Sequence, residues 1–403
     1  MSDSQDRPQQ PAADPAAAPP AAGVAADTVG EVAGDAEATA SLGRRLRYPR
    51  RVVLVAGAGR SGTSTLAGVL QRLHLYVPQP EVDADTTNPR GFGESAWVVR
   101  HHDRMLRRAN VNMADARPDA WLDAARIAAM PNCRVPTSKF LEEQFGFGSE
   151  VVIKDPRLSW FLGLWQAAAV RTESTAVVVT MLRPPAEVIG SKQDHYANRL
   201  GAPHLAASWL NMMLHTERAG RDLQEGAGRS FVRYTDLLGD WTSTIMRLGE
   251  ELQLQNVLHA GTTAVTDVDT FIDPALRRTE RTLADMPISS RMRELVEETD
   301  AALNSMADPG GDTAEVRATL DQLRTAYVDL YADAEAVTRS TALAAVERGR
   351  REGREAARAE SAPDGSGDEA GGAADAATGL ARRAARRLPE PVKGRLRDLR
   401  GRG

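Results

Sequence analysis

A short apolar run, a glycine-framed loop and a helical pattern follow one another without interruption near residue 57. The run 52–55 is Val-Val-Leu-Val, residues 57–64 are Gly-Ala-Gly-Arg-Ser-Gly-Thr-Ser, and a helical pattern begins at Thr65. A strand that leads through a glycine-rich loop into a helix presents backbone N–H groups that attract an anion such as phosphate. The sequence therefore predicts an anion-binding loop, whatever its side chains are.

The loop departs from the common nucleoside-triphosphate pattern at one position. Gly57 and Gly62 have the spacing of GxxxxGK[ST], but Thr63 stands in place of the lysine, and the only cation in the loop is Arg60. Phosphoryl transfer from a triphosphate needs that lysine and ligands for Mg²⁺. A 5′-phosphosulfate donor carries less charge on its transferable group, and one cation with N–H groups and hydroxyls could stabilise its leaving phosphate without a metal.

Apolar runs alternate with helical patterns along the middle of the chain. The runs cover residues 52–55, 151–153, 176–182 and 230–234. Short runs without polar alternation indicate parallel strands that are buried on both faces. We therefore predict an α/β fold with a P-loop-type doubly wound parallel sheet flanked by helices. Ligands of such sheets bind beyond the carboxyl ends of the strands.

The two ends of the chain differ in composition from its middle. Residues 1–47 are acidic and rich in proline and alanine, and residues 361–403 form a linker and a basic tail. Both compositions predict disordered tails. Between them we place the main domain at residues 48–310 and a long helical extension at residues 311–360. The basic tail suits weak contact with an anionic surface, although a solvated tail is the alternative.

Composition also excludes several classes of protein. Cys133 is the only cysteine, so the chain has neither an internal disulfide nor a metal site built from cysteines. It has no apolar run long enough to cross a bilayer, and its first residues lack the basic start and apolar core of a signal peptide. We therefore expect a cytoplasmic protein, with no bound metal and no nucleic-acid partner.

Two motifs resemble those of sulfotransferases that use 3′-phosphoadenosine-5′-phosphosulfate (PAPS). The loop is similar to the family's 5′-phosphosulfate loop, which implies that Arg60 stands at the position where the family has a lysine or an arginine. Arg183 ends a predicted strand and precedes Ser191 by eight positions, similar to the family's 3′-phosphate site. A guanidinium and a hydroxyl both suit a phosphate. The resemblance implies PAPS as co-substrate, bound by Gly59, Arg60, Ser61, Gly62, Thr63, Ser64, Arg183 and Ser191.

Two later segments extend the resemblance to about residue 300. Residues 233–237 resemble the family's segment R-Y-E-D-L, with Thr235 in place of the usual acid, which implies that Tyr234 borders the nucleotide. A tyrosine that only packs is an equal alternative. Residues 271–278 are similar to a late segment of bacterial members, which implies that Arg278 closes over the phosphates. The alternative is a plain surface pair of arginines.

An acceptor that attacks sulfur must lose a proton, so a general base should lie near the loop. Residues 88–94 resemble the N-P-x-G-x-x-E element of bacterial and glycosaminoglycan-type sulfotransferases, which implies that Glu94 is the base. The alternative is an acid in the first turn of the following helix. His101 and His102 are further candidates because histidine titrates near neutral pH.

Lys154 belongs to a Lys-Asp-Pro-Arg-Leu segment that recurs, by resemblance, in bacterial members beside the active site. The resemblance implies that Lys154 orients an acceptor or sulfuryl oxygen. A structural pair of Lys154 with Asp155 is the alternative.

We interpret the chain as a PAPS-dependent sulfotransferase. It would move a sulfuryl group in line to a hydroxyl or amine of a small-molecule or glycan acceptor, for example a carbohydrate or glycolipid. Two other hypotheses stay open. One is a P-loop kinase or nucleoside triphosphatase with an atypical loop, in which Asp155 would mimic the acid that holds Mg²⁺. The other is a non-catalytic scaffold of the same fold.

Overall fold

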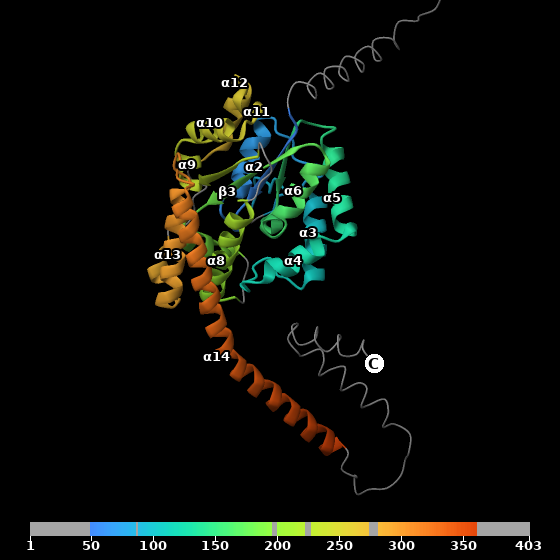
Figure 1. Ribbon diagram of the computed structural model, residues 1–403, viewed down its shortest axis with the longest axis vertical. Coiled ribbons are helices and arrows are strands. Elements are labelled where there is room, and N and C mark those ends of the chain that lie inside the picture. The colour runs from blue at the N-terminus through green and yellow to red at the C-terminus, as the bar shows by residue number, and fades with distance from the viewer. Residues whose placement is uncertain (1–48, 86–87, 196–199, 222–226, 274–280, 361–403) are drawn as a thin grey trace, which may run out of the picture. The chain divides into compact units, whose positions relative to one another are not determined.

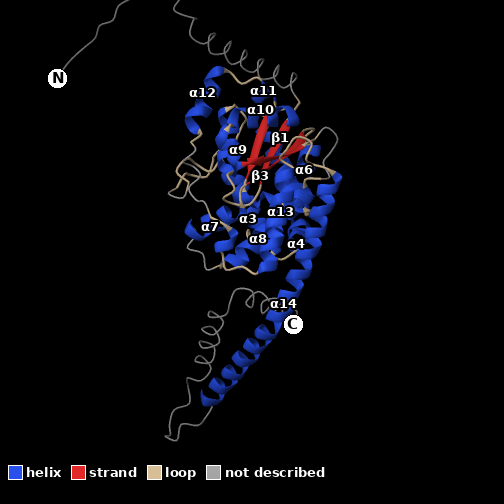
Figure 2. Ribbon diagram, turned by 90° about the vertical axis from the view of Figure 1, so that its left-hand side faces the viewer, coloured by secondary structure: helices blue, strands red, loops and turns tan. Residues whose placement is uncertain are grey.

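Four parallel strands lie side by side inside the main domain (Figure 2). The computed structural model describes residues 49–85, 88–195, 200–221, 227–273 and 281–360. The strand order is β2-β1-β3-β4. The strands are β1 (Arg51–Ala56), β2 (Glu150–Lys154), β3 (Thr175–Leu182) and β4 (Arg229–Arg233). This arrangement confirms the predicted parallel α/β sheet.

Helices cover both faces of the sheet (Figure 1). In chain order they are α2 (Thr63–Arg72), α3 (Ala96–Ala109), α4 (Ala120–Ala128), α5 (Pro131–Gln144), the 3₁₀ turn η1 (Pro156–Trp160), α6 (Leu162–Arg171), α7 (Pro185–His195), α8 (Ala202–Ala219), α9 (Tyr234–Gly239), α10 (Trp241–Leu252), α11 (Gln255–Leu258), α12 (Thr262–Phe271), the 3₁₀ turn η3 (Leu283–Asp285), α13 (Ser290–Ser305) and α14 (Ala314–Glu360).

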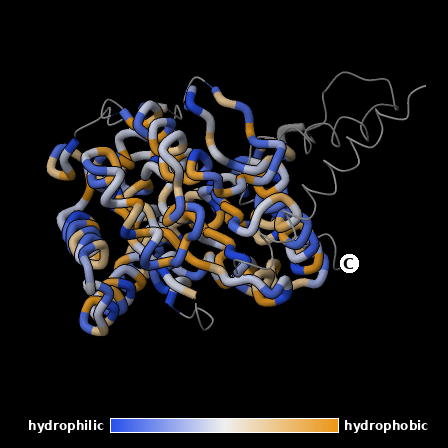
Figure 3. Tube along the Cα trace, turned by 90° about the horizontal axis from the view of Figure 1, so that it is seen from above, coloured by the Kyte–Doolittle hydropathy of each residue, from blue (hydrophilic) through white to orange (hydrophobic). Residues whose placement is uncertain are grey.

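The central strand β1 shows why the apolar runs do not alternate. Val52 and Leu54 belong to a core shared with α3, α5, α6 and α8, whereas Val53 and Val55 belong to a second core shared with α2, α10 and α12. Since both faces are buried, every position favours an apolar side chain. The hydrophobic parts of the trace accordingly gather in the interior (Figure 3).

The observed elements match the predicted ones closely, with small shifts at their ends. The fourth predicted run reached Tyr234, but β4 ends at Arg233 and Tyr234 begins α9. Helix α2 begins at Thr63, two residues before the predicted start, and α7 begins at Pro185, where a missing N–H is tolerated. The predicted disordered tails, residues 1–47 and 361–403, lie outside the described residues.

The C-terminal helix α14 belongs to two compact units. The first unit extends to Asp333. Leu320, Leu323 and Tyr327 of α14 are buried in the core of this unit. The second unit begins at Ala334, and its helical residues are exposed as far as Arg358.

None of the described helices combines the length and hydrophobicity that crossing a membrane requires.

The Tyr327 hydroxyl anchors the first part of α14 by donating to the backbone oxygens of Ala116 and Ala207. We expect Tyr327→Phe to lower the free energy of unfolding by about 1–2 kcal/mol, because two buried acceptors lose their donor. Urea unfolding followed by circular dichroism measures this change. The control is Tyr76→Phe, since the Tyr76 ring stacks on Phe147 and its hydroxyl makes no hydrogen bond to a described residue. Equal stability of Tyr327→Phe and the wild type would contradict the anchoring role.

Candidate active site

A cavity of about 530 Å³ lies beyond the carboxyl ends of the strands. Its walls come from the loop after β1, from residues 88–94 and 112–114, and from the end of β2 with the start of η1. Residues after β3, helices α7 and α8, and the start of α9 complete them. Strand β1 lies between β2 and β3, so the chain leaves β1 toward one side of the sheet and later returns to its other side. Ligands of open α/β sheets bind at such a switch point.

The cavity brings together most of the residues that the sequence singled out. Those that line it are Gly59, Arg60, Gly62, Thr63, Ser64, Glu94, Lys154, Arg183, Ser191 and Tyr234. Ser61 lies behind this lining and is 1% exposed, and its Oγ has no hydrogen-bond partner among the described residues. Arg278, which was predicted to close over the phosphates, lies outside the described residues.

Gly62 fixes the shape of the loop. Its φ of 95° is left-handed, and a Cβ at this position would lie 2.3 Å from a ring atom of Tyr234. Only glycine combines that φ with so close an approach. The Tyr234 ring therefore packs on the turn that leads into α2, where the first N–H groups of the helix have no partners within the helix. The turn has the strand–loop–helix geometry on which the predicted anion-binding loop depends.

The two predicted phosphate sites touch each other. Arg60 Nε donates a hydrogen bond to Ser191 Oγ at 3.0 Å, and Arg183 Nη1 donates to the backbone oxygen of Arg60 at 3.1 Å. Arg183 also pairs with Glu187 at 2.9 Å and lies over the Tyr234 ring, 5.0 Å from its centroid. The loop and α7 therefore form one continuous basic wall.

Lys192 adds a cation to this wall that the sequence analysis missed. It lines the cavity next to Ser191, it is 7% exposed, and its Cε lies 4.0 Å from the position of a Cβ on Gly59. Burial lowers the pKa of Lys192 to about 8. No hydrogen bond or ion pair joins its ammonium to another described residue. The signal in the sequence was only its position after Ser191, which does not reveal burial.

Glu94 and Lys154 meet on the opposite side of the loop. Lys154 Nζ contacts Glu94 Oε1 at 2.5 Å and donates to Ser64 Oγ at 3.0 Å. Gly93 has a φ of 61°, and a Cβ there would lie 2.8 Å from the Ala67 side chain of α2, so this loop packs tightly against the helix. Burial raises the pKa of Glu94, although the Lys154 ammonium opposes the rise.

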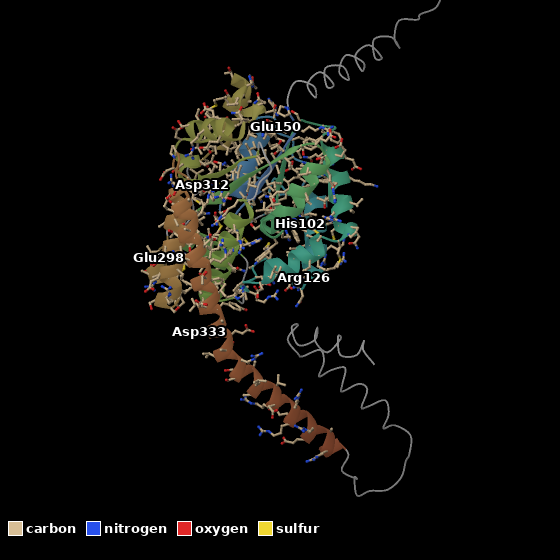
Figure 4. The ribbon with its side chains drawn as sticks, in the orientation of Figure 1. His102, Arg126, Glu150, Glu298, Asp312 and Asp333 are labelled. Carbon is tan, nitrogen blue, oxygen red and sulfur yellow. The ribbon has the colours of Figure 1, made fainter. Side chains whose placement is uncertain are left out.

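The two histidine candidates lie away from the cavity. His101 Nε2 is 3.0 Å from Thr137 Oγ1, and the His101 ring stacks on Trp97. His102 lies in the interior (Figure 4). Trp165 donates to its Nε2, so its Nδ1 carries the proton that bonds Asp155 Oδ2 at 2.7 Å. Both histidines therefore serve the packing of α3.

Asp155 is a structural carboxylate. Besides the His102 contact on Oδ2, its Oδ1 accepts hydrogen bonds from the backbone N–H and the guanidinium of Arg157. Burial alone would raise the pKa of Asp155, but the His102 hydrogen bond and the Arg157 charge lower it to about 2. Both oxygens are occupied, so this carboxylate does not present a free oxygen to a Mg²⁺ ion.

No protein-family model and no curated protein sequence matches this chain. Three solved structures are similar to it in part. The sulfotransferase domain of the Synechococcus PCC 7002 olefin synthase is 18% identical, with a TM-score of 0.38, over 63% of this chain and 95% of that domain. The Mycobacterium tuberculosis H37Rv sulfotransferase STF1 is 15% identical, with a TM-score of 0.37, over 67% of this chain and 80% of STF1.

The sulfotransferase domain of the curacin biosynthetic pathway is 16% identical, with a TM-score of 0.37, over 64% of this chain and 99% of that domain. Similarity at this level carries no conclusion about activity.

We expect Asp155→Asn to lower the free energy of unfolding at neutral pH by about 2–4 kcal/mol, because a buried charged contact is broken. The folded-state pKa of Asp155 is depressed, so its contribution is full above the unfolded pKa near 4 and is lost as the pH falls toward 2. Urea unfolding at pH 7, 4 and 2 measures the difference, which should shrink over the last interval. Asp119→Asn, at an exposed helix start with no capping hydrogen bond, is the control. A difference that does not depend on pH would contradict this role of Asp155.

Proposed function

We propose that this protein transfers a sulfuryl group from PAPS to a hydroxyl or amine of a small-molecule or glycan acceptor. The observation that carries the proposal is the direct contact of the two anion sites. Arg60 of the loop bonds Ser191, and Arg183 bonds the Arg60 backbone, within one cavity. Two anion sites this close suit two phosphates on a single ribose better than the linear chain of a triphosphate.

The residues around the loop fit this donor. Ser61 has a buried hydroxyl without a described partner, which a phosphate oxygen above the loop would complete. Arg60 and the N–H groups at the start of α2 would stabilise negative charge on the leaving 5′-phosphate. Arg183 and Ser191 would hold the 3′-phosphate, and Lys192 adds positive charge beside Gly59. When bound, PAPS supplies the sulfuryl group.

Glu94 is the side chain best placed to accept the acceptor's proton. It lines the cavity near the loop, and its partner Lys154 also bonds Ser64. Because burial raises the pKa of Glu94, its carboxylate is a stronger base than an exposed glutamate. Lys154 orients this carboxylate and adds a positive charge close to the site of transfer.

The nucleoside triphosphatase hypothesis is less well supported by this geometry. It requires a lysine in the loop, where Thr63 stands, and a carboxylate for Mg²⁺. Both oxygens of Asp155 are held by His102 and Arg157. The hypothesis of a non-catalytic scaffold predicts a cavity that binds neither PAPS nor ATP.

We expect 3′,5′-ADP to raise the melting temperature without any metal. At a hundredfold excess over its Kd, a ligand stabilises the folded state by about 2.7 kcal/mol. Arg183→Ala and Lys192→Met should each weaken this binding by about tenfold or more, since each removes a cation from the wall. Arg100→Ala is the matched control, because Arg100 is exposed and does not line the cavity.

Differential scanning fluorimetry and calorimetric titration measure these changes. Stabilisation by ATP with Mg²⁺ but not by 3′,5′-ADP would overturn the proposal in favour of a triphosphatase. A lack of stabilisation by both nucleotides would favour the scaffold. If Lys192→Met binds 3′,5′-ADP as the wild type does, Lys192 does not contribute to nucleotide binding, and the other proposed site residues are unaffected by this result.

We expect Glu94→Gln to bind 3′,5′-ADP as the wild type does and to lose about 10²–10⁴-fold in turnover, the usual contribution of a general base. The base must be ionised, so wild-type kcat/KM should fall as the pH drops through the raised pKa of Glu94. Transfer of ³⁵S from labelled PAPS to a panel of hydroxyl and amine acceptors measures the rate. Turnover retained in Glu94→Gln would exclude Glu94 as the base.

A further inference from the structure

A second cavity, of about 520 Å³, lies between α4, α5, η1, α6 and α8. It shares no lining residue with the first cavity. Its floor includes small side chains such as Ala125, Ala128 and Ala167, and Gly163 of α6 adds no side chain at all. Such positions leave space where larger residues would have closed the gap between the helices.

Three aromatic rings form one wall of this cavity. His215 of α8 stacks on Trp121 of α4, with ring centroids 5.7 Å apart and planes 20° apart. It also stacks on Trp160 of η1, at 5.6 Å and 17°. All three residues line the cavity. A wall of nearly parallel rings favours contact with another flat ring.

Two arginines give the second cavity a positive charge. Arg134 and Arg218 both line the cavity, and neither forms an ion pair with a described carboxylate. The Nε of Arg134 is buried without any hydrogen-bond partner among the described residues. The Arg218 guanidinium lies over the Trp121 ring, 5.8 Å from its centroid. A buried arginine nitrogen without an acceptor is satisfied by water or by an acceptor atom of a ligand.

Two carboxylates on helices that line this cavity are already engaged in ion pairs. Glu217 of α8 pairs with Arg221, Arg229 and Arg324. Asp123 of α4 pairs with Arg117 and Arg126. No aspartate or glutamate is among the lining residues of this cavity in the described part of the chain.

The protonation state of His215 is consistent with an excess of positive charge around this cavity. Burial, together with the charges of Arg324 and Arg218, lowers the pKa of His215 to about 4. At neutral pH the ring is therefore uncharged, and it stacks as an aromatic group between two tryptophans.

We propose that this second cavity binds a small organic anion with a flat aromatic body, whose carboxylate, sulfonate or sulfate group is held by Arg134 and Arg218 while its ring contacts the Trp121–His215–Trp160 wall. The site is independent of the function proposed for the first cavity. Its ligand class follows from the combination of an aromatic wall and two arginines without carboxylate partners.

Naphthalene-2-sulfonate is a suitable probe, and naphthalene-2-sulfonamide is its neutral counterpart of nearly the same shape. Calorimetric titration of the full chain should show saturable one-to-one binding of the sulfonate and binding of the sulfonamide that is weaker by about tenfold or more. Arg134→Gln and Arg218→Gln should each weaken sulfonate binding by about tenfold. Arg126→Gln is the matched control, since this α4 arginine projects at the surface and pairs with Asp123 (Figure 4).

Gly163→Leu tests the location without disturbing the fold. A Cβ at Gly163 would meet no atom within 4 Å, and leucine is favoured over glycine in a helix, so this variant should unfold at the wild-type temperature or above. Its side chain should occupy the cavity and abolish sulfonate binding. Arg183→Ala, which alters only the first cavity, should leave sulfonate binding unchanged.

Three results would overturn the proposal. They are the absence of saturable sulfonate binding, equal binding of the neutral sulfonamide, and binding that persists in Gly163→Leu. Loss of binding in Arg183→Ala would instead assign the sulfonate to the first cavity.

Discussion

The structure of this domain depends on the buried contact of Asp155 with His102 and Arg157. Asp155 directly follows β2, His102 lies on α3, and Arg157 lies in η1, so one carboxylate joins three elements. A buried carboxylate is stable only where hydrogen bonds and opposite charge replace its water. With these partners fixed, Lys154 ends β2 beside Glu94 and Ser64, and the wall of the first cavity takes its shape.

Much of the fold could be predicted from the sequence because burial leaves a local signature. Strands that are covered on both faces read as short apolar runs, and the loop between β1 and α2 carries its glycines at fixed spacing. The position of Arg183 also followed from local order, since it comes directly after a strand. These features depend on a few neighbouring residues and therefore need no knowledge of tertiary packing.

The pairings across the fold could not be predicted in the same way. Asp155 meets His102 from 53 positions away, and Lys154 meets Glu94 from 60 positions away. No local pattern distinguishes such a histidine from a base, or such an aspartate from a metal ligand. The burial of Lys192 likewise depends on how α7 packs, and the second cavity depends on gaps among five separate elements.

Arg183 has a further consequence for how a ligand is recognised. The same guanidinium that would meet an anion beside α7 also supports the backbone of Arg60 in the loop. A group that draws Arg183 toward itself alters the support of the loop, and a group that settles in the loop alters the freedom of Arg183. If both proposed subsites bind anions, their affinities would be thermodynamically coupled, and this coupling would be reciprocal. For a molecule that carries both anionic groups, the binding free energy would then differ from the sum of the binding free energies of its two halves supplied separately.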